Sequence, residues 1–263
     1  KMWYFLLLLP ILHTIIKKKN VKHYITAFLF AIAITEISSY LVWFEIIEPF
    51  RHSTVENPTP FMSHISYNPI LCFAIYLVLY EIFFNKNLTN LKFFFYSFFS
   101  IIMIINMFIT GGRAGQVMFF AMLMILIFQF FDTSKIKSLI LSIIIIPSIF
   151  FVAYQTSDIF ELRVNEGFQN IYYYSDNQLT SVGLRINFAT NSWDVIQKNL
   201  IIGVGTGDFP IEYRKINLIN TPDLYVTTNP HNMYILVLMQ LGLMGLISFI
   251  SIFYYQIKFS LNS

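Results

Sequence analysis

The sequence has few charged residues and almost no cysteine. Asp, Glu, Lys and Arg make up 12% of its 263 residues, roughly half the share that soluble domains carry. Cys72 is the single cysteine, so no disulfide can form within the chain and no redox compartment is indicated. The net charge is only +3, and basic residues are spread between apolar runs, which argues against nucleic-acid binding. Apolar residues make up 56% of the chain, which indicates lipid as the solvent.

Long apolar runs predict an all-α membrane protein. A helix needs about 20 mostly apolar residues to cross the hydrocarbon core of a bilayer, and seven segments reach or approach that length. We therefore predict a polytopic transmembrane helical bundle. Because the chain begins at Lys1, almost inside an apolar run and without a signal-peptide pattern, we expect further spans upstream in a longer parent protein. The predicted spans are residues 2–16, 24–48, 69–84, 93–110, 117–131, 138–154 and 232–255.

Lysines gather in alternate short loops, which predicts the orientation of the spans. The two short loops on the other side hold one basic residue each, Arg51 and Arg113. We expect the lysine-rich side to be cytoplasmic and the long polar segment 155–231 to face the other side. Residues 1–263 should form one membrane-embedded domain in which this outer segment is partly helical, with an amphipathic helix over 181–199. The lysines are Lys17, Lys18, Lys19, Lys22, Lys86, Lys92, Lys135, Lys137 and Lys258.

Three features on the predicted outer side could carry chemistry. A glycine-rich turn with Gly112 and Arg113 opens a span, where free backbone N–H groups and a guanidinium suit a phosphate or diphosphate. Arg185 lies in the predicted helix 181–199, and His231 opens the last span with Pro230 at the first helical position. A neutral imidazole there could act as a general base. Each feature also has a simpler explanation when taken alone: Arg113 as an interfacial arginine, Arg185 as part of a solvated helix face, and His231 as a helix cap. Their shared surface favours one anionic, lipid-linked substrate.

Other ionisable residues are weaker candidates for the site. Arg214 could contact phosphate, although a solvated helix face explains it as well, and Asp208 in a glycine-rich turn has a simpler structural explanation. Glu36 lies inside a predicted span, where charge is costly and often functional. The outer-loop histidines have no cysteine or carboxylate partner at ligand spacing, so we expect no metal site.

Five short strings in the second half of the chain carry a family resemblance: Thr110–Gly115, Gly183–Arg185 followed by Trp193, Leu200–Phe209, Pro230–Tyr234 and Gln240–Leu246. In this order they resemble the O-antigen ligase and polymerase superfamily over about residues 100–255. Its members are bacterial inner-membrane glycosyltransferases with many spans and one large periplasmic loop. The family pattern has a small residue or Ser where Gly112 stands, a mild departure. The resemblance aligns the family's two arginines with Arg113 and Arg185, and its histidine with His231.

The resemblance implies a transfer reaction at the periplasmic face of a Gram-negative inner membrane. An undecaprenyl-diphosphate-linked O-antigen glycan would move onto a sugar hydroxyl of the lipid A core, without cofactor or metal. Arg113, Arg185 and Gly112 would bind the diphosphate, and His231 would deprotonate the acceptor, with inversion at the anomeric carbon. The expected partners are the lipid-linked donor, the lipid A-core acceptor and membrane lipids. Related members polymerise O-antigen units or glycosylate proteins, so both activities remain alternatives.

Two alternatives come from other functional classes. A transporter of lipid-linked glycans predicts ionisable residues within several spans and two similar halves. The sequence has Glu36 but no cationic residue in the middle of a span and no internal repeat. A structural or assembly factor would not need Arg113, Arg185 and His231 on one surface.

Overall fold

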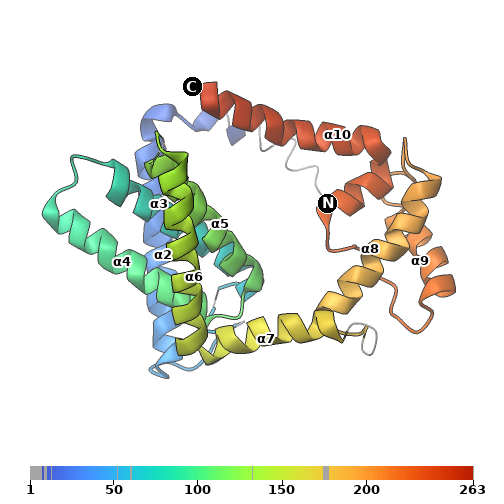
Figure 1. The fold of residues 1–263 in the computed structure, drawn as a ribbon, viewed down its shortest axis with the longest axis horizontal. Coiled ribbons are helices and arrows are strands. Elements are labelled where there is room, and N and C mark those ends of the chain that lie inside the picture. The colour runs from blue at the N-terminus through green and yellow to red at the C-terminus, as the bar shows by residue number, and fades with distance from the viewer. Residues whose placement is uncertain are drawn as a thin grey trace. The chain divides into compact units, whose positions relative to one another are not determined.

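The computed structural model describes residues 8, 11, 12, 14–51, 53–59, 61–131, 133–173 and 178–262. That part of the chain folds into nine α-helices and one short 3-10 helix without any β-strand, which confirms the all-α expectation. Six helices, labelled in Figure 1, are long and apolar enough to cross a membrane. The predicted span 2–16 falls largely outside the described residues. The six are α2 (Val21–Trp43), α3 (His64–Phe84), α4 (Asn90–Ile109), α5 (Arg113–Phe130), α6 (Lys135–Thr156) and α10 (Met233–Asn262).

Local capping moves the end of the first described span. Helix α2 ends at Trp43 rather than at residue 48, because Glu45 adopts a left-handed backbone with φ of 55°. The backbone N–H groups of Glu45 and Ile46 donate to the carbonyls of Val42 and Leu41 at 3.0 and 2.9 Å. This pair of hydrogen bonds is a Schellman motif, which stops a helix by satisfying its last carbonyls.

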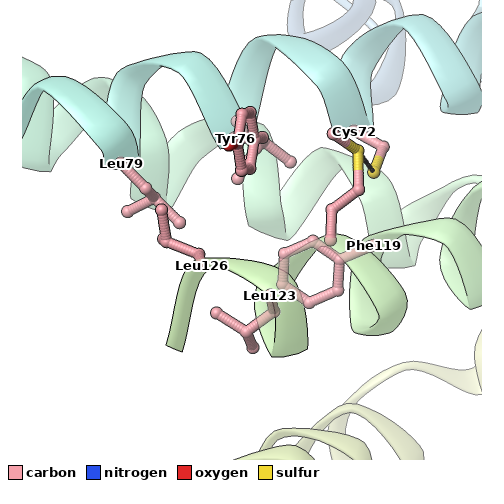
Figure 2. Close-up of a pocket in the computed structure, with 8 residues that line it drawn as sticks. Cys72, Tyr76, Leu79, Phe119, Leu123 and Leu126 are labelled. Carbon is pink, nitrogen blue, oxygen red and sulfur yellow. Dashed lines mark hydrogen bonds between the residues drawn. The ribbon is translucent and has the colours of Figure 1, made fainter. Parts of the chain in front are cut away.

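The chain divides into two compact units, Lys1–Val164 and Asn165–Ser263. In the first unit α3 packs against α4 and α5, and α5 packs against α6. Figure 2 shows Cys72 of α3 beside Phe119 of α5, and the Cys72 Sγ lies 3.4 Å from the Met122 Sδ. These helices expose many large apolar side chains, as expected for surfaces that meet lipid.

The second unit is built from α8 (Ser181–Lys198), α9 (Phe209–Asn220) and α10. Helices α8 and α9, together with α7 (Asp158–Tyr172), which crosses the boundary between the units, make the segment 155–231 partly helical, as expected. The predicted helix 181–199 corresponds to α8. One membrane-embedded domain with this segment as its outer loop remains a prediction. The buried core of the second unit contains Phe188, Val195, Ile196, Phe209, Tyr213 and Met239.

Helix α10 is broken at Gly242, whose backbone has φ of 64° and ψ of −164°. Figure 1 shows the two parts of α10 meeting at a bend. The break leaves carbonyls without helical partners, and the N–H groups of Val204 and Gly205 donate to the carbonyls of Met239 and Gln240, each at 2.9 Å. The glycine-rich turn after α8 therefore completes the hydrogen bonds of the broken span, which a bilayer would otherwise leave unsatisfied.

Candidate functional site

Two asparagine side chains hold the glycine-rich turn between α4 and α5. Asn68 of α3 is fully buried, and its Oδ1 accepts a hydrogen bond from the Thr110 hydroxyl at 2.9 Å. Asn57, in the loop before α3, accepts from the Gly111 N–H through its Oδ1 at 2.8 Å. A longer contact of 3.4 Å joins the Asn68 Nδ2 to the Gly112 carbonyl. The turn is therefore clamped by polar groups from another helix and another loop.

Glycines let the turn and the start of α5 lie directly against α3. A Cβ on Gly112 would come within 2.6 Å of the Asn68 Cγ and 2.8 Å of the His64 carbonyl oxygen. A Cβ on Gly115 would lie 2.6 Å from the backbone carbonyl carbon of Asn68. Real Cβ atoms do not approach other atoms this closely. Close packing therefore accounts for the glycine at 112, and its contact with a diphosphate remains a prediction.

Arg113 is the first residue of α5 and directly follows the clamped turn. Its side chain is partly exposed, whereas the three residues before it are buried. The first N–H groups of a helix lack helical partners and carry partial positive charge. The turn thus combines a guanidinium with the positive end of a candidate membrane span, a suitable environment for an anion.

The second predicted arginine lies near the start of α8. The Thr180 hydroxyl caps this helix by accepting from the Gly183 N–H at 3.0 Å. Arg185 follows in the first turns and is exposed, while Phe188, one turn further on, is 1% exposed and belongs to the core. Trp193, two turns beyond Arg185, is 51% exposed. Arg185 therefore projects from a well-anchored helix.

His231 precedes α10 instead of belonging to its first turn. The helix begins at Met233, and its cap is Asn232, whose Oδ1 accepts from the Tyr234 N–H at 3.0 Å. The prediction that Pro230 occupies the first helical position is therefore wrong by three residues, because the Asn232 side chain supplies the cap instead.

The imidazole of His231 is held by an aromatic contact. Its ring stacks on Phe188 with centroids 5.9 Å apart and planes 25° apart. Its backbone has φ of 54°, and its N–H donates to the Asn229 Oδ1 at 2.8 Å. Within the second unit, His231 therefore contacts Phe188, and Arg185 lies one helical turn before Phe188 on α8. Arg113 belongs to the first unit, and the meeting of all three residues remains a prediction.

The weaker candidates lie on or beside α9. Asp208 directly precedes this helix, and its Oδ2 would lie 2.8 Å from a Cβ on Gly205, so the carboxylate covers the glycine-rich turn. Arg214 is exposed on the helix. Between them, Tyr213 is fully buried, and this burial raises the pKa of its hydroxyl above the ordinary value. A role for Asp208 or Arg214 in substrate binding remains a prediction.

Glu36 is a buried acid in the middle of α2. It is 2% exposed and accepts a hydrogen bond from the Tyr67 hydroxyl of α3. Its second carboxyl oxygen has no hydrogen-bond partner in the described part of the chain. Glu36 therefore links two spans of the first unit, α2 and α3, through a hydrogen bond.

Sequence reasoning did not identify the residues that surround the glycine-rich turn. Asn57 and Asn68 precede Thr110 by more than forty positions, and Arg163 follows Thr110 by fifty-three. The Arg163 guanidinium lies beside Gly111. The one feature of the sequence that could have pointed to this environment is Asn68, a polar residue at the edge of a predicted span.

Comparison with known protein families identifies the family of the chain. Residues 98–250, more than half of the chain, match the family model described as O-antigen ligase. No curated protein matched the chain. The matched range includes the clamped turn, α8, the His231 segment and the break in α10. Members of this family are glycosyltransferase-like enzymes that act on lipid-linked glycans. The chain belongs to the O-antigen ligase family.

Proposed function

We propose that the protein is an O-antigen ligase of a Gram-negative inner membrane. It transfers an undecaprenyl-diphosphate-linked glycan onto a sugar hydroxyl of the lipid A core at the periplasmic face. Family membership supports glycosyl transfer from a lipid-linked donor. The observation that carries the proposal is Arg113, the first residue of a membrane-length helix, directly after a turn clamped by Asn57 and Asn68. A lipid-linked diphosphate occupies the membrane boundary, which is where such a helix ends.

The donor's leaving group determines what the arginines do. The bond between the anomeric carbon and the diphosphate oxygen breaks, and its electron pair stays on the diphosphate. Negative charge therefore grows on that oxygen as the transition state forms. Arg113 and Arg185 stabilise this charge more strongly in the transition state than in the ground state, which lowers the barrier. Guanidinium groups suit the task because they bind phosphate oxygens through two parallel hydrogen bonds.

His231 acts on the acceptor. Its imidazole takes the proton of the sugar hydroxyl as the hydroxyl oxygen attacks the anomeric carbon from the side opposite the diphosphate. The product therefore has inverted configuration, and the proton leaves the imidazole for water after transfer. Stacking on Phe188 supports this role because it limits the orientations of the ring. The arginines stabilise the leaving group and the histidine moves the proton, so the scheme needs neither metal nor cofactor.

A transfer assay with the purified full chain tests the proposal. The assay contains undecaprenyl-diphosphate-linked glycan and lipid A core, and compares the wild-type protein with His231→Ala. The matched control is His23→Ala, which removes an exposed histidine from α2. We expect transfer to the core to fall by about 100-fold or more in His231→Ala, the usual contribution of a general base, and to persist in the control. Near-normal transfer by both His231→Ala and Arg113→Lys would contradict the scheme.

The same assay separates the alternatives. Extension of the donor glycan without core transfer would identify a polymerase, and transfer to a peptide hydroxyl would identify a protein O-oligosaccharyltransferase. No product from folded wild-type protein would overturn the proposal and favour a transporter, which a vesicle flipping assay with the same donor would detect.

A further inference from the structure

We propose that Arg163 is a further phosphate-binding residue, which shares the donor diphosphate with Arg113 at the turn between α4 and α5. This inference rests on the proposed function and extends it to a residue outside the sequence motifs. The family match covers position 163 but assigns it no role.

The first observation is the closeness of Arg163 to the turn. A Cβ on the buried Gly111 would lie 2.9 Å from the Arg163 Nε and 3.3 Å from its Nη2. The guanidinium thus occupies space that any other residue at position 111 would fill. A single residue separates Gly111 from Arg113, so Arg113 and Arg163 both adjoin the turn between α4 and α5. The absence of a side chain at position 111 is what brings the second arginine to the turn.

The second observation is that the backbone carrying Arg163 is anchored. The Ser157 hydroxyl donates to the Phe108 carbonyl of α4 at 2.7 Å, directly before α7 begins. Phe160 is 3% exposed, and its ring packs against Phe108 with centroids 5.0 Å apart. Arg163 follows Phe160 by three residues, about one helical turn. The guanidinium is therefore positioned before any substrate arrives, and little ordering is left to oppose binding.

The third observation is the charge around the turn. Arg113, Arg163 and the first N–H groups of α5 all contribute positive charge there, and Arg163 also interacts electrostatically with His64. Of the acids next to Arg163 on α7, Glu161 is exposed and two residues away, so it does not share a face with Arg163, whereas Glu166, three residues further on, does. The Arg163 side chain is partly exposed although its Nε is buried. Two guanidinium groups at one turn match the two phosphates of a lipid diphosphate better than one group would.

Binding of undecaprenyl diphosphate to the purified full chain tests the inference. Arg163→Gln should weaken binding by about tenfold or more, the usual effect of losing hydrogen bonds to a charged group. Arg163→Lys keeps the charge but not the planar fork, and should bind with intermediate affinity. Arg51→Gln is the matched control, because Arg51 is an exposed arginine of the same unit that lies over the Phe61 ring. This control should bind like the wild type.

A purely structural role for Arg163 predicts a different pattern. Losing a structural contact between α7 and the turn would lower the Tm and kcat while leaving the donor KM unchanged. The inference predicts a donor KM raised by about tenfold at nearly constant Tm, with partial recovery in Arg163→Lys. The inference is overturned if Arg113→Gln weakens binding while Arg163→Gln binds normally, and the proposed function then stands. Wild-type protein that neither binds nor transfers the donor would instead remove the proposed function itself.

Discussion

The imidazole of His231 lies on the ring of Phe188, with centroids 5.9 Å apart and an interplanar angle of 25°. Phe188 is 1% exposed and belongs to the core of the second unit. It also lies one helical turn after Arg185 on α8. A core side chain thus supports the proposed base and lies close along the helix to one proposed cation. A catalytic group held by packing is oriented before the substrate binds.

Replacing Phe188 by Leu should reduce activity more than stability. Leucine keeps most of the apolar volume, so the free energy of unfolding should fall by about 1 kcal/mol, but the flat surface under His231 is lost. We expect glycan transfer to fall by about tenfold or more, because small misplacements of reacting groups are costly. Phe209→Leu is the control, since Phe209 is equally buried but stacks on Tyr213. Equal loss of transfer in the two variants would count against a role for the stack.

Thr110 and Asn68 should act as one unit. Thr110→Val or Asn68→Ala each leaves a buried polar partner unsatisfied, and each should lower the free energy of unfolding by about 1–3 kcal/mol. The double variant should lose less than the sum of the two. Labelling of Cys72, a free and buried thiol, by a thiol-reactive dye during heating measures unfolding of the first unit. Strictly additive losses would show that the contact contributes little.

Gly242→Ala should disrupt the break in α10. Gly242 has φ of 64°, and an added Cβ would lie 2.6 Å from the Ile202 nitrogen. We expect a clear fall in Tm, measured by circular dichroism, and loss of transfer. Gly167→Ala in α7 should have the opposite effect on stability, since no described atom lies within 4 Å of its added Cβ. It should stabilise the protein by about 0.5–1 kcal/mol, because alanine favours helix. A stable, active Gly242→Ala variant would contradict the importance of the break.

Glu36→Gln should leave the first unit intact. A glutamine carbonyl can still accept from the Tyr67 hydroxyl, so Cys72 labelling should occur near the wild-type temperature. Tyr67→Phe removes the donor to a buried carboxyl group and should lower the Tm. Transfer should persist in Glu36→Gln. A stable Glu36→Gln variant that has lost all activity would instead point to proton or ion movement through Glu36.

The helices were the more predictable part of the fold. Six of the predicted spans correspond to helices of membrane length, because apolar composition and length are properties of each segment alone. Helix α8 was predictable for a similar reason, since its apolar spacing is local. Helix ends were less predictable. Glu45 stops α2 in a left-handed conformation that favours glycine, and α10 begins after its cap Asn232 rather than at Pro230, the expected first helical residue.

The sequence by itself determined the membrane-helix class, through the length of its apolar runs, and the family, through motifs kept in a particular order. The tertiary structure decided which distant residues surround the candidate site. Asn68 reaches the turn because α3 packs against α4 and α5, Arg163 because Ser157 and Phe160 contact Phe108 of α4, and Asn57 comes from the loop before α3. Such contacts join positions tens of residues apart and depend on how side chains fill the space between helices. The periodicity of any one segment carries no record of them.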